Sequence, residues 1–191
     1  MDYLVERMRL AGCSEIRIVT RSEKLDVVEN ASRHGATVIE AYPRSLAKSF
    51  FTGMKDLPDD DIVLLGYPDS IWEPPDGYSP VIDLLGECEV ALGLFHTSEP
   101  QRCEVVTLSN AGTRSGQVAG IELRPPAPTS NLIWGCAAAR ASVLRGLERE
   151  REPGEYFNSL CSRGAVAGVW LSDTYVDIGT SEGLREALAM R

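Results

Sequence analysis

The sequence has few basic residues, few histidines and no long apolar run. Its 191 residues include 19 Lys and Arg against 28 Asp and Glu, which gives a net charge of -9, and only 2 His. This balance argues against a protein that holds nucleic acid by neutralising its phosphates, although a nucleotide needs only a few local donors or a metal. No apolar run reaches membrane-spanning length, so we expect no membrane partner. The acidic, amphipathic N-terminus is not typical of a signal peptide.

The five cysteines are widely spaced and form no CxxC pair or Cys/His cluster, which argues against a structural zinc site. Scattered single cysteines are typical of reduced, mostly buried thiols in a cytoplasmic protein. Neither histidine stands beside a Ser or Cys nucleophile in a motif, so nucleophilic catalysis has no support here.

Helical and strand patterns alternate along the chain, without an internal repeat or a low-complexity tract. The first part predicts three helices, each followed by a strand. The helices lie at 2–11, after Ser22 as the cap with Leu25, Val27 and Val28 apolar, and at 46–54; the strands lie at 16–19, 37–39 and 62–65. This order favours a parallel sheet with right-handed crossovers. The remainder predicts helices at 78–85, 141–150, 156–163 and 182–190, and strands at 89–95, 104–108, 118–123, 132–137 and 166–171. We interpret residues 1–191 as one α/β domain.

Two acidic residues follow apolar strand-like segments. Asp69 comes after the run Ile62–Leu65 and a Gly and a Pro, and Asp177 lies between Val176 and Ile178. Ligands of open parallel sheets bind beyond the carboxyl ends of the strands. For each acid the alternative is a turn or helix-cap role, since Thr180 or Ser181 caps the last helix. Two such acids at one sheet edge could share Mg²⁺, which prefers one or two carboxylates plus substrate phosphates.

Five segments of the sequence stand in a characteristic order: Gly66-x-Pro68-Asp69-x-Ile71-x-Glu73-Pro74, Ala91–Phe95, Val118-x-x-Ile121-Glu122-x-Arg124-Pro125-Pro126, Trp134-Gly135 and Val176–Thr180. Together they resemble the sugar-phosphate nucleotidyltransferases, the nucleoside-diphosphate-sugar pyrophosphorylases, over nearly the whole chain. The resemblance implies a GT-A-like, Rossmann-related α/β fold with a mixed, mostly parallel sheet flanked by helices. It also implies the reaction of that family, in which a nucleoside triphosphate and a sugar 1-phosphate combine and pyrophosphate is released.

The same resemblance assigns roles to individual residues. Asp69 and Asp177 match the two metal aspartates of the family, which implies Mg²⁺ as the cofactor, and Arg124 would hold the phosphate of the sugar. Glu122 and Gly135 fall at positions beside the sugar, where the glycine would let the backbone approach the substrate. The loop that recognises the base is matched by Ser45, Leu46, Ala47 and Lys48.

The sequence also departs from the family at several of these positions. Ser45 and Lys48 replace a glycine and a polar base reader, Leu123 replaces an acid, and Cys103-Glu104 stands in the place of an aromatic-glycine pair beside the sugar. These departures leave the choice of base and sugar open. A homo-oligomer is common in the family, but no interface pattern is evident in this sequence.

The opening strand of the family, its Gly-rich loop (G-x-G-T-R-L-x-P) and a Lys-Pro pair have no counterpart in these residues. In the family that loop holds the triphosphate with backbone N–H groups. About 30 family residues would precede Met1, and their strand would lie between the strands at 16–19 and 62–65. An empty slot there would leave buried backbone groups unpaired, at about 1–3 kcal/mol each. We therefore expect an incomplete reading of a longer protein; alternatively, another segment or chain fills the slot, or the fold is rearranged.

Three functional hypotheses remain. The first is a Mg²⁺-dependent sugar-1-phosphate nucleotidyltransferase. The second is a degenerate or truncated relative that binds a nucleotide sugar without catalysis. The third is a GT-A glycosyltransferase, which ranks last because the segment Asp69-Ser70-Ile71 lacks the Asp-x-Asp pair of that class. The run Asp59–Asp61 precedes its strand and is typical of a solvated surface.

Overall fold

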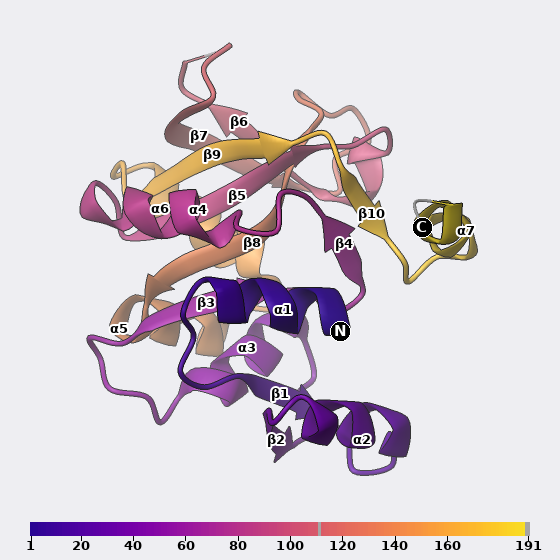
Figure 1. The fold of residues 1–191 in the computed structure, drawn as a ribbon. Helices are drawn as coiled ribbons and strands as arrows, with labels where there is room; N and C mark the ends of the chain where they lie inside the picture. The colour runs from indigo at the N-terminus through magenta and orange to yellow at the C-terminus, as the bar shows by residue number, and fades with distance from the viewer. Residues whose placement is uncertain (111, 190–191) are drawn as a thin grey trace.

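A six-stranded mixed sheet forms the centre of the molecule (Figure 1). The computed structural model describes residues 1–110 and 112–189. The strands lie in the order β3 (Ile62–Gly66), β8 (Leu132–Arg140), β5 (Val90–His96), β9 (Val166–Ser172), β7 (Ser115–Leu123) and β6 (Glu104–Leu108). In this sheet only β5 and β9 run parallel to each other, and all its other pairs of neighbouring strands are antiparallel.

Apolar side chains cover both faces of this sheet because its central strands are apolar throughout. β5 has the sequence VALGLFH, and its first six residues are buried. One face packs against α3 (Leu46–Met54), α5 (Ala141–Leu144), the 3₁₀ helix η3 (Arg145–Arg149) and α6 (Pro153–Cys161). The other face packs against α1 (Asp2–Leu10) and α4 (Tyr78–Asp83), which the short helix η1 (Leu84–Gly86) follows. The result is a three-layer α/β/α arrangement.

A separate two-stranded parallel sheet lies beside β3. It consists of β1 (Arg17–Thr20) and β2 (Thr37–Glu40), which are joined by α2 (Leu25–Arg33). The polar Ser22 does not cap α2: that helix begins after Lys24, and the Ser22 hydroxyl lies 3.1 Å from the Tyr42 hydroxyl instead.

Between β1 and β3 lies a slot of about 400 Å³. Its two sides are the strand edges at residues 16–19 and 62–66, and among the described residues no strand pairs with either edge. Apolar side chains of α1 and α3 line it as well, including Leu4, Phe50 and Met54. In Figure 1, α1 lies in front of β3, and α3 is seen between β3 and β1. The slot lies where the sequence predicts an absent strand.

A second small sheet carries the C-terminal part of the chain. β4 (Ser70–Trp72) and β10 (Tyr175–Asp177) pair antiparallel, and we call this pair the β4–β10 ribbon. α7 (Ser181–Ala189) follows β10 and packs on the ribbon through Ala187, which lies with Ile71 and Val176. Its predicted last residue, Met190, lies outside the described residues.

The predicted mixed α/β fold is confirmed, and most predicted elements lie within a few residues of their expected place. Besides the cap of α2, two features differ. The ribbon strands β4 and β10 were not expected, since each has only three residues. Most strand pairs are antiparallel and not parallel as expected, because β8 runs opposite to its neighbours β3 and β5, and β7 runs opposite to its neighbours β6 and β9. All five cysteines are free thiols. No helix in the described part of the chain has the length and apolarity needed to cross a membrane.

Candidate active site

The structure brings Asp69 and Asp177 together. If Gly179 carried a Cβ, that atom would lie 3.0 Å from Asp177 Oδ1 and 3.3 Å from Asp69 Oδ2. Two carboxylate oxygens from distant parts of the sequence therefore flank one point. Glycine at position 179 keeps that point free of a side chain.

Pairing within the ribbon produces this convergence. Asp177 lies opposite Ser70, and the amide of Ile178 donates to the carbonyl of Asp69 over 2.8 Å. The Gly179 amide donates to Asp177 Oδ1 over 2.9 Å and orients that carboxylate. Thr180 then caps α7, because its hydroxyl accepts a hydrogen bond from the Gly183 amide.

The two carboxylates suit a hard divalent cation whose remaining ligands are substrate phosphates and water. Two carboxylates can contribute oxygen ligands, and the described residues contain no group of three or more His, Cys, Asp or Glu that could hold a metal alone. Mg²⁺ is bound in this way, through one or two carboxylates together with substrate phosphates and water. The chemistry of the site therefore fits the metal that the sequence implies.

Two tyrosines lie around this pair. Burial raises the pKa of Tyr175, with smaller contributions from Cys103 and the two aspartates, so its hydroxyl stays neutral. Burial is also the main cause that raises the pKa of Tyr67, and the charges of Glu104, Glu152 and Asp69 act in the same direction. The Tyr67 ring packs on Trp134 with the ring centroids 5.3 Å apart. The charge of Asp69 and the charges of Glu104 and Glu152, which belong to a second group of polar residues, thus all act on Tyr67.

The second group gathers at residues 150–152, just before α6. Ser45, the N-cap of α3, lies with its hydroxyl 3.4 Å from the Glu150 carbonyl, and the Ala47 amide donates to the Arg151 carbonyl over 3.2 Å. The segment Ser45–Lys48 thus forms the first turn of α3. Ala47 is fully buried in that turn, whereas Lys48 is exposed.

Arg124 reaches the same segment from the other side. Its Nη2 lies 3.2 Å from Glu152 Oε1, and both side chains are accessible to solvent. Its backbone has a φ of 44°, in the left-handed region that costs a non-glycine residue roughly 1–2 kcal/mol. Such strain is more frequent at functional sites than elsewhere, which agrees with a functional role for this arginine.

Glu122 and Gly135 have local partners. Glu122 pairs in register with Val105, and its carboxylate accepts a hydrogen bond from the Thr129 hydroxyl over 2.9 Å. The space beside the Gly135 Cα is filled by the rings of Tyr175 and Phe95, with a Phe95 carbon 2.9 Å from the place of a Cβ. The glycine therefore admits these rings, and its expected role beside the sugar stays a prediction.

Glu104 lies near Glu152 and Arg124, and in the sequence it stands out only as a departure from the family. Its Oε2 accepts a hydrogen bond from Trp134 Nε1 over 2.6 Å, and its Oε1 accepts one from the Gly154 amide over 3.3 Å. Burial raises the pKa of this carboxyl, and Glu152 adds to the rise, while the Trp134 hydrogen bond opposes it. The signal in the sequence is the departure from the aromatic-glycine pair at 103–104.

Solved structures share this arrangement of elements. A protein from Bacillus anthracis described as a glucose-1-phosphate thymidylyltransferase, in complex with a sucrose, is 19% identical, with a TM-score of 0.83 over 99% of this chain and 80% of that one. The UDP-glucose pyrophosphorylase complexed with UDP-glucose is 16% identical, with a TM-score of 0.81 over 98% of this chain and 84% of that one. The chain has the fold of sugar-phosphate nucleotidyltransferases.

A third structure with this nucleotidyltransferase fold, the UTP-bound UGPase from Acinetobacter baumannii, is 18% identical, with a TM-score of 0.79 over 99% of this chain and 80% of that one. No protein-family model and no curated protein matches the sequence. At these identities the likeness describes the fold, and the chemistry must be argued from the residues of this chain.

Proposed function

We propose that this chain carries out nucleotidyl transfer from a nucleoside triphosphate to a sugar 1-phosphate. The observation that carries the proposal is the convergence of the Asp69 and Asp177 carboxylates within the nucleotidyltransferase fold. In the reaction, a phosphate oxygen of the sugar phosphate attacks the α-phosphorus and forms a new P–O bond. The bond from the α-phosphorus to the bridging oxygen breaks, and pyrophosphate leaves with that electron pair.

Asp69 and Asp177 would hold Mg²⁺ through their facing oxygens. The metal would supply neutralisation of the phosphate charge that develops during transfer. Arg124 would bind the phosphate of the sugar with its planar guanidinium, which matches phosphate geometry, after exchanging its contact with Glu152. Catalysis by these groups is mainly positioning and charge stabilisation, as for phosphoryl transfer in general.

The remaining residues would determine which substrate is held. The first turn of α3, Ser45–Lys48, presents the exposed Lys48 and would contact the base. Glu122 would accept hydrogen bonds from sugar hydroxyls in competition with Thr129. Glu104 and Glu152 place two further carboxylates in this region, so a substrate with hydrogen-bond donors suits it better than one with additional negative charge.

The test is release of pyrophosphate by the purified protein. A panel of nucleoside triphosphates is combined with sugar 1-phosphates and Mg²⁺, and we expect turnover with at least one pair. Asp69→Asn and Asp177→Asn should each lower kcat by about 100-fold or more, the scale of losing one group that stabilises transition-state charge. Asp60→Asn is the matched control, because that carboxylate is 99% exposed and lies in the solvated run before β3.

Two outcomes would contradict the proposal. Absence of turnover with every pair, while calorimetry detects binding of a nucleotide sugar, would favour the binding-only alternative. Equal activity of Asp177→Asn and Asp60→Asn would show that the aspartate pair has no part in the reaction.

A further inference from the structure

The β4–β10 ribbon is too small to hold its own position. Each strand has three residues, and the ribbon is separate from the six-stranded sheet. An isolated two-stranded pair is marginally stable at best in water. The placement of Asp69 and Asp177, at one end of this ribbon, therefore depends on what holds its other end.

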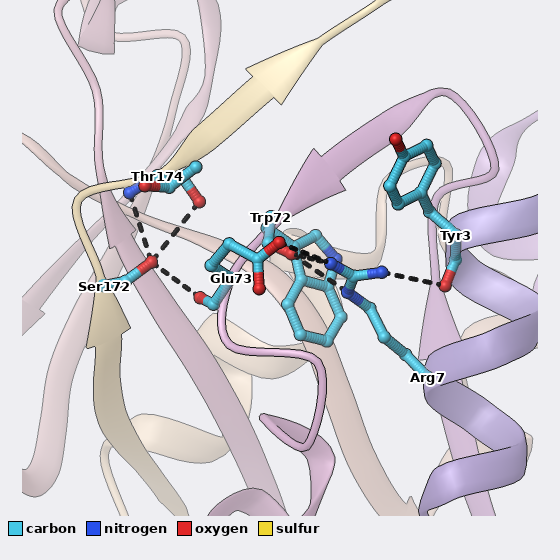
Figure 2. A network of polar contacts seen from close by, with 6 residues as sticks. All are labelled: Tyr3, Arg7, Trp72, Glu73, Ser172 and Thr174. Carbon is cyan, nitrogen blue, oxygen red and sulfur yellow. Dashed lines mark hydrogen bonds and ion pairs between the residues drawn. The ribbon is translucent and has the colours of Figure 1, made fainter. Parts of the chain in front are cut away.

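Arg7 of α1 holds that other end (Figure 2). Its side chain is 3% exposed, and its Nε donates to the Trp72 carbonyl over 2.9 Å. Nη2 contacts the same carbonyl and lies 3.3 Å from Glu73 Oε1. The guanidinium also lies 4.9 Å from the centre of the Trp72 ring. One arginine thus fixes both the last carbonyl of β4 and the ring beside it.

The same guanidinium is tied to its own helix. Nη1 donates to the Tyr3 carbonyl over 3.2 Å, and the guanidinium carbon lies 5.4 Å from the centre of the Tyr3 ring. Tyr3 packs in turn with the apolar residues of the ribbon, Ile71 and Val176. The arginine therefore connects α1 to the ribbon through a planar group whose donors point in two directions.

Ser172 attaches the ribbon to β9. Its hydroxyl donates to the Glu73 carbonyl over 2.6 Å and accepts a hydrogen bond from the Thr174 amide over 3.1 Å. The Glu73 amide donates to the Thr174 carbonyl over 3.3 Å. As Figure 2 shows, Arg7 and Ser172 thus meet the chain at adjacent residues, 72 and 73, from opposite sides.

We propose that Arg7 is a positioning residue for the Asp69–Asp177 pair, acting through the ribbon; this rests on the proposed function. Trp72 lies opposite Tyr175 and Ser70 lies opposite Asp177, so a shift at the Trp72 carbonyl moves both strands in register. A lysine has a single point of charge and cannot hold the Trp72, Tyr3 and Glu73 oxygens in one plane. The distance between the two carboxylates is therefore set in part by Arg7 of α1, which holds the end of the ribbon away from Asp69 and Asp177.

The experiment compares Arg7→Lys with Arg145→Lys. Arg145 is a matched control because its guanidinium also donates to backbone carbonyls, those of Lys55 over 2.7 Å and Leu57 over 2.9 Å, and to the Asp59 carboxylate. Both substitutions keep the charge and remove the planar donor array. Two quantities are measured on folded protein: amide hydrogen exchange at Ile178, whose N–H bonds to Asp69, and the affinity for Mn²⁺ alone.

We expect Arg7→Lys to speed exchange at Ile178 and to weaken Mn²⁺ binding by about 10-fold, the lower end of losses seen when supporting groups around metal ligands are changed. Arg145→Lys should leave both quantities unchanged, even if it lowers the melting temperature as much as Arg7→Lys does. Ser172→Ala, which removes only a hydroxyl, should shift both quantities in the same direction as Arg7→Lys.

Equal Ile178 exchange in the Arg7 and Arg145 variants would overturn the positioning role. So would unchanged Mn²⁺ affinity in Arg7→Lys when the original protein binds the ion. If the original protein binds no Mn²⁺ but Ile178 exchange responds selectively to Arg7→Lys, the positioning role stands and the proposed metal-dependent function fails. The two failures are therefore distinguishable.

Discussion

Glu104 places a carboxyl group between the Trp134 indole and the first turn of α6, where only part of it meets water. Charged carboxyls are rarely placed so, because burial disfavours the charged form. Two donors, one indole and one backbone amide, compensate for part of this cost. By the sequence resemblance this residue stands at the place of an aromatic-glycine pair beside the sugar, so an effect of Glu104 on substrate choice stays a prediction.

The raised pKa of Glu104 predicts a pH dependence of stability. Above the ordinary glutamate pKa of 4.5 the unfolded chain releases this proton, while the folded protein retains it until a higher pH. The free energy of unfolding contributed by this group therefore falls as the pH rises from 4.5 through the folded-state pKa. The Glu104→Gln variant lacks this titrating group. Its free energy of unfolding, relative to that of the original protein, should therefore increase as the pH rises over that range.

Chemical denaturation at a series of pH values measures this difference. Glu87→Gln serves as the control, because it makes the same substitution at an exposed glutamate. The same pH dependence for Glu104→Gln and Glu87→Gln would mean that the Glu104 carboxyl is solvated in the folded protein.

At the scale of elements, β8 and the β4–β10 ribbon pack closely against each other at Gly135. The rings of Tyr175, from β10, and Phe95, from β5, occupy the place of a side chain there and lie 5.2 Å apart. Tyr175 is two residues before Asp177, so the packing at Gly135 bears on the position of the aspartate pair. A glycine in a strand commonly marks such a close approach.

Gly135→Ala should lower the free energy of unfolding by about 1–3 kcal/mol, the usual cost of overpacking a core. Gly120→Ala is a suitable comparison, because that glycine also lies in a strand and its Cβ would meet its nearest neighbour at an ordinary 3.6 Å. Urea denaturation of the two variants gives the comparison. Equal stability of both would show that Tyr175 and Phe95 can move aside at no cost.

At the scale of the whole molecule, the slot separates β1 and β2 from the main sheet. Its sides are strand edges and its other walls are apolar faces of α1 and α3, which together suit one extended segment with apolar side chains on both faces. The Ala141 amide donates to the Asp61 carbonyl, and antiparallel pairing alternates along a strand. Val63 and Leu65 therefore bond to β8, whereas the Leu64 amide faces the slot.

We expect the Leu64 amide to exchange with solvent at least about 100-fold faster than the Leu65 amide in the 191-residue protein, since a paired amide opens only with the sheet. A strand in the slot, from this polypeptide or another, would slow Leu64 to the rate of Leu65. Hydrogen exchange followed by NMR resolves the two residues. Slow exchange at Leu64 without any added segment would show that the fold has rearranged to close the slot.

The order and type of the large elements could be predicted because they depend on local patterns. The apolar runs of β3 and β5, the spacing of Phe50 and Met54 in α3, and the turn chemistry after Asp177 are all visible in the sequence. The resemblance in five ordered segments added the fold class. The metal and substrate roles of the selected residues stay predictions, as do the oligomeric state and the cytoplasmic location.

What only the tertiary structure decided are the relations between residues far apart in the chain. The ribbon has strands too short to stand out by periodicity, yet its pairing is what brings Asp69 to Asp177. The burial of Glu104 and the clamp of Arg7 on Trp72 likewise depend on neighbours from other elements. Local patterns determine which segments form helices and strands, whereas the facing of side chains is set by packing among segments that the linear sequence leaves apart.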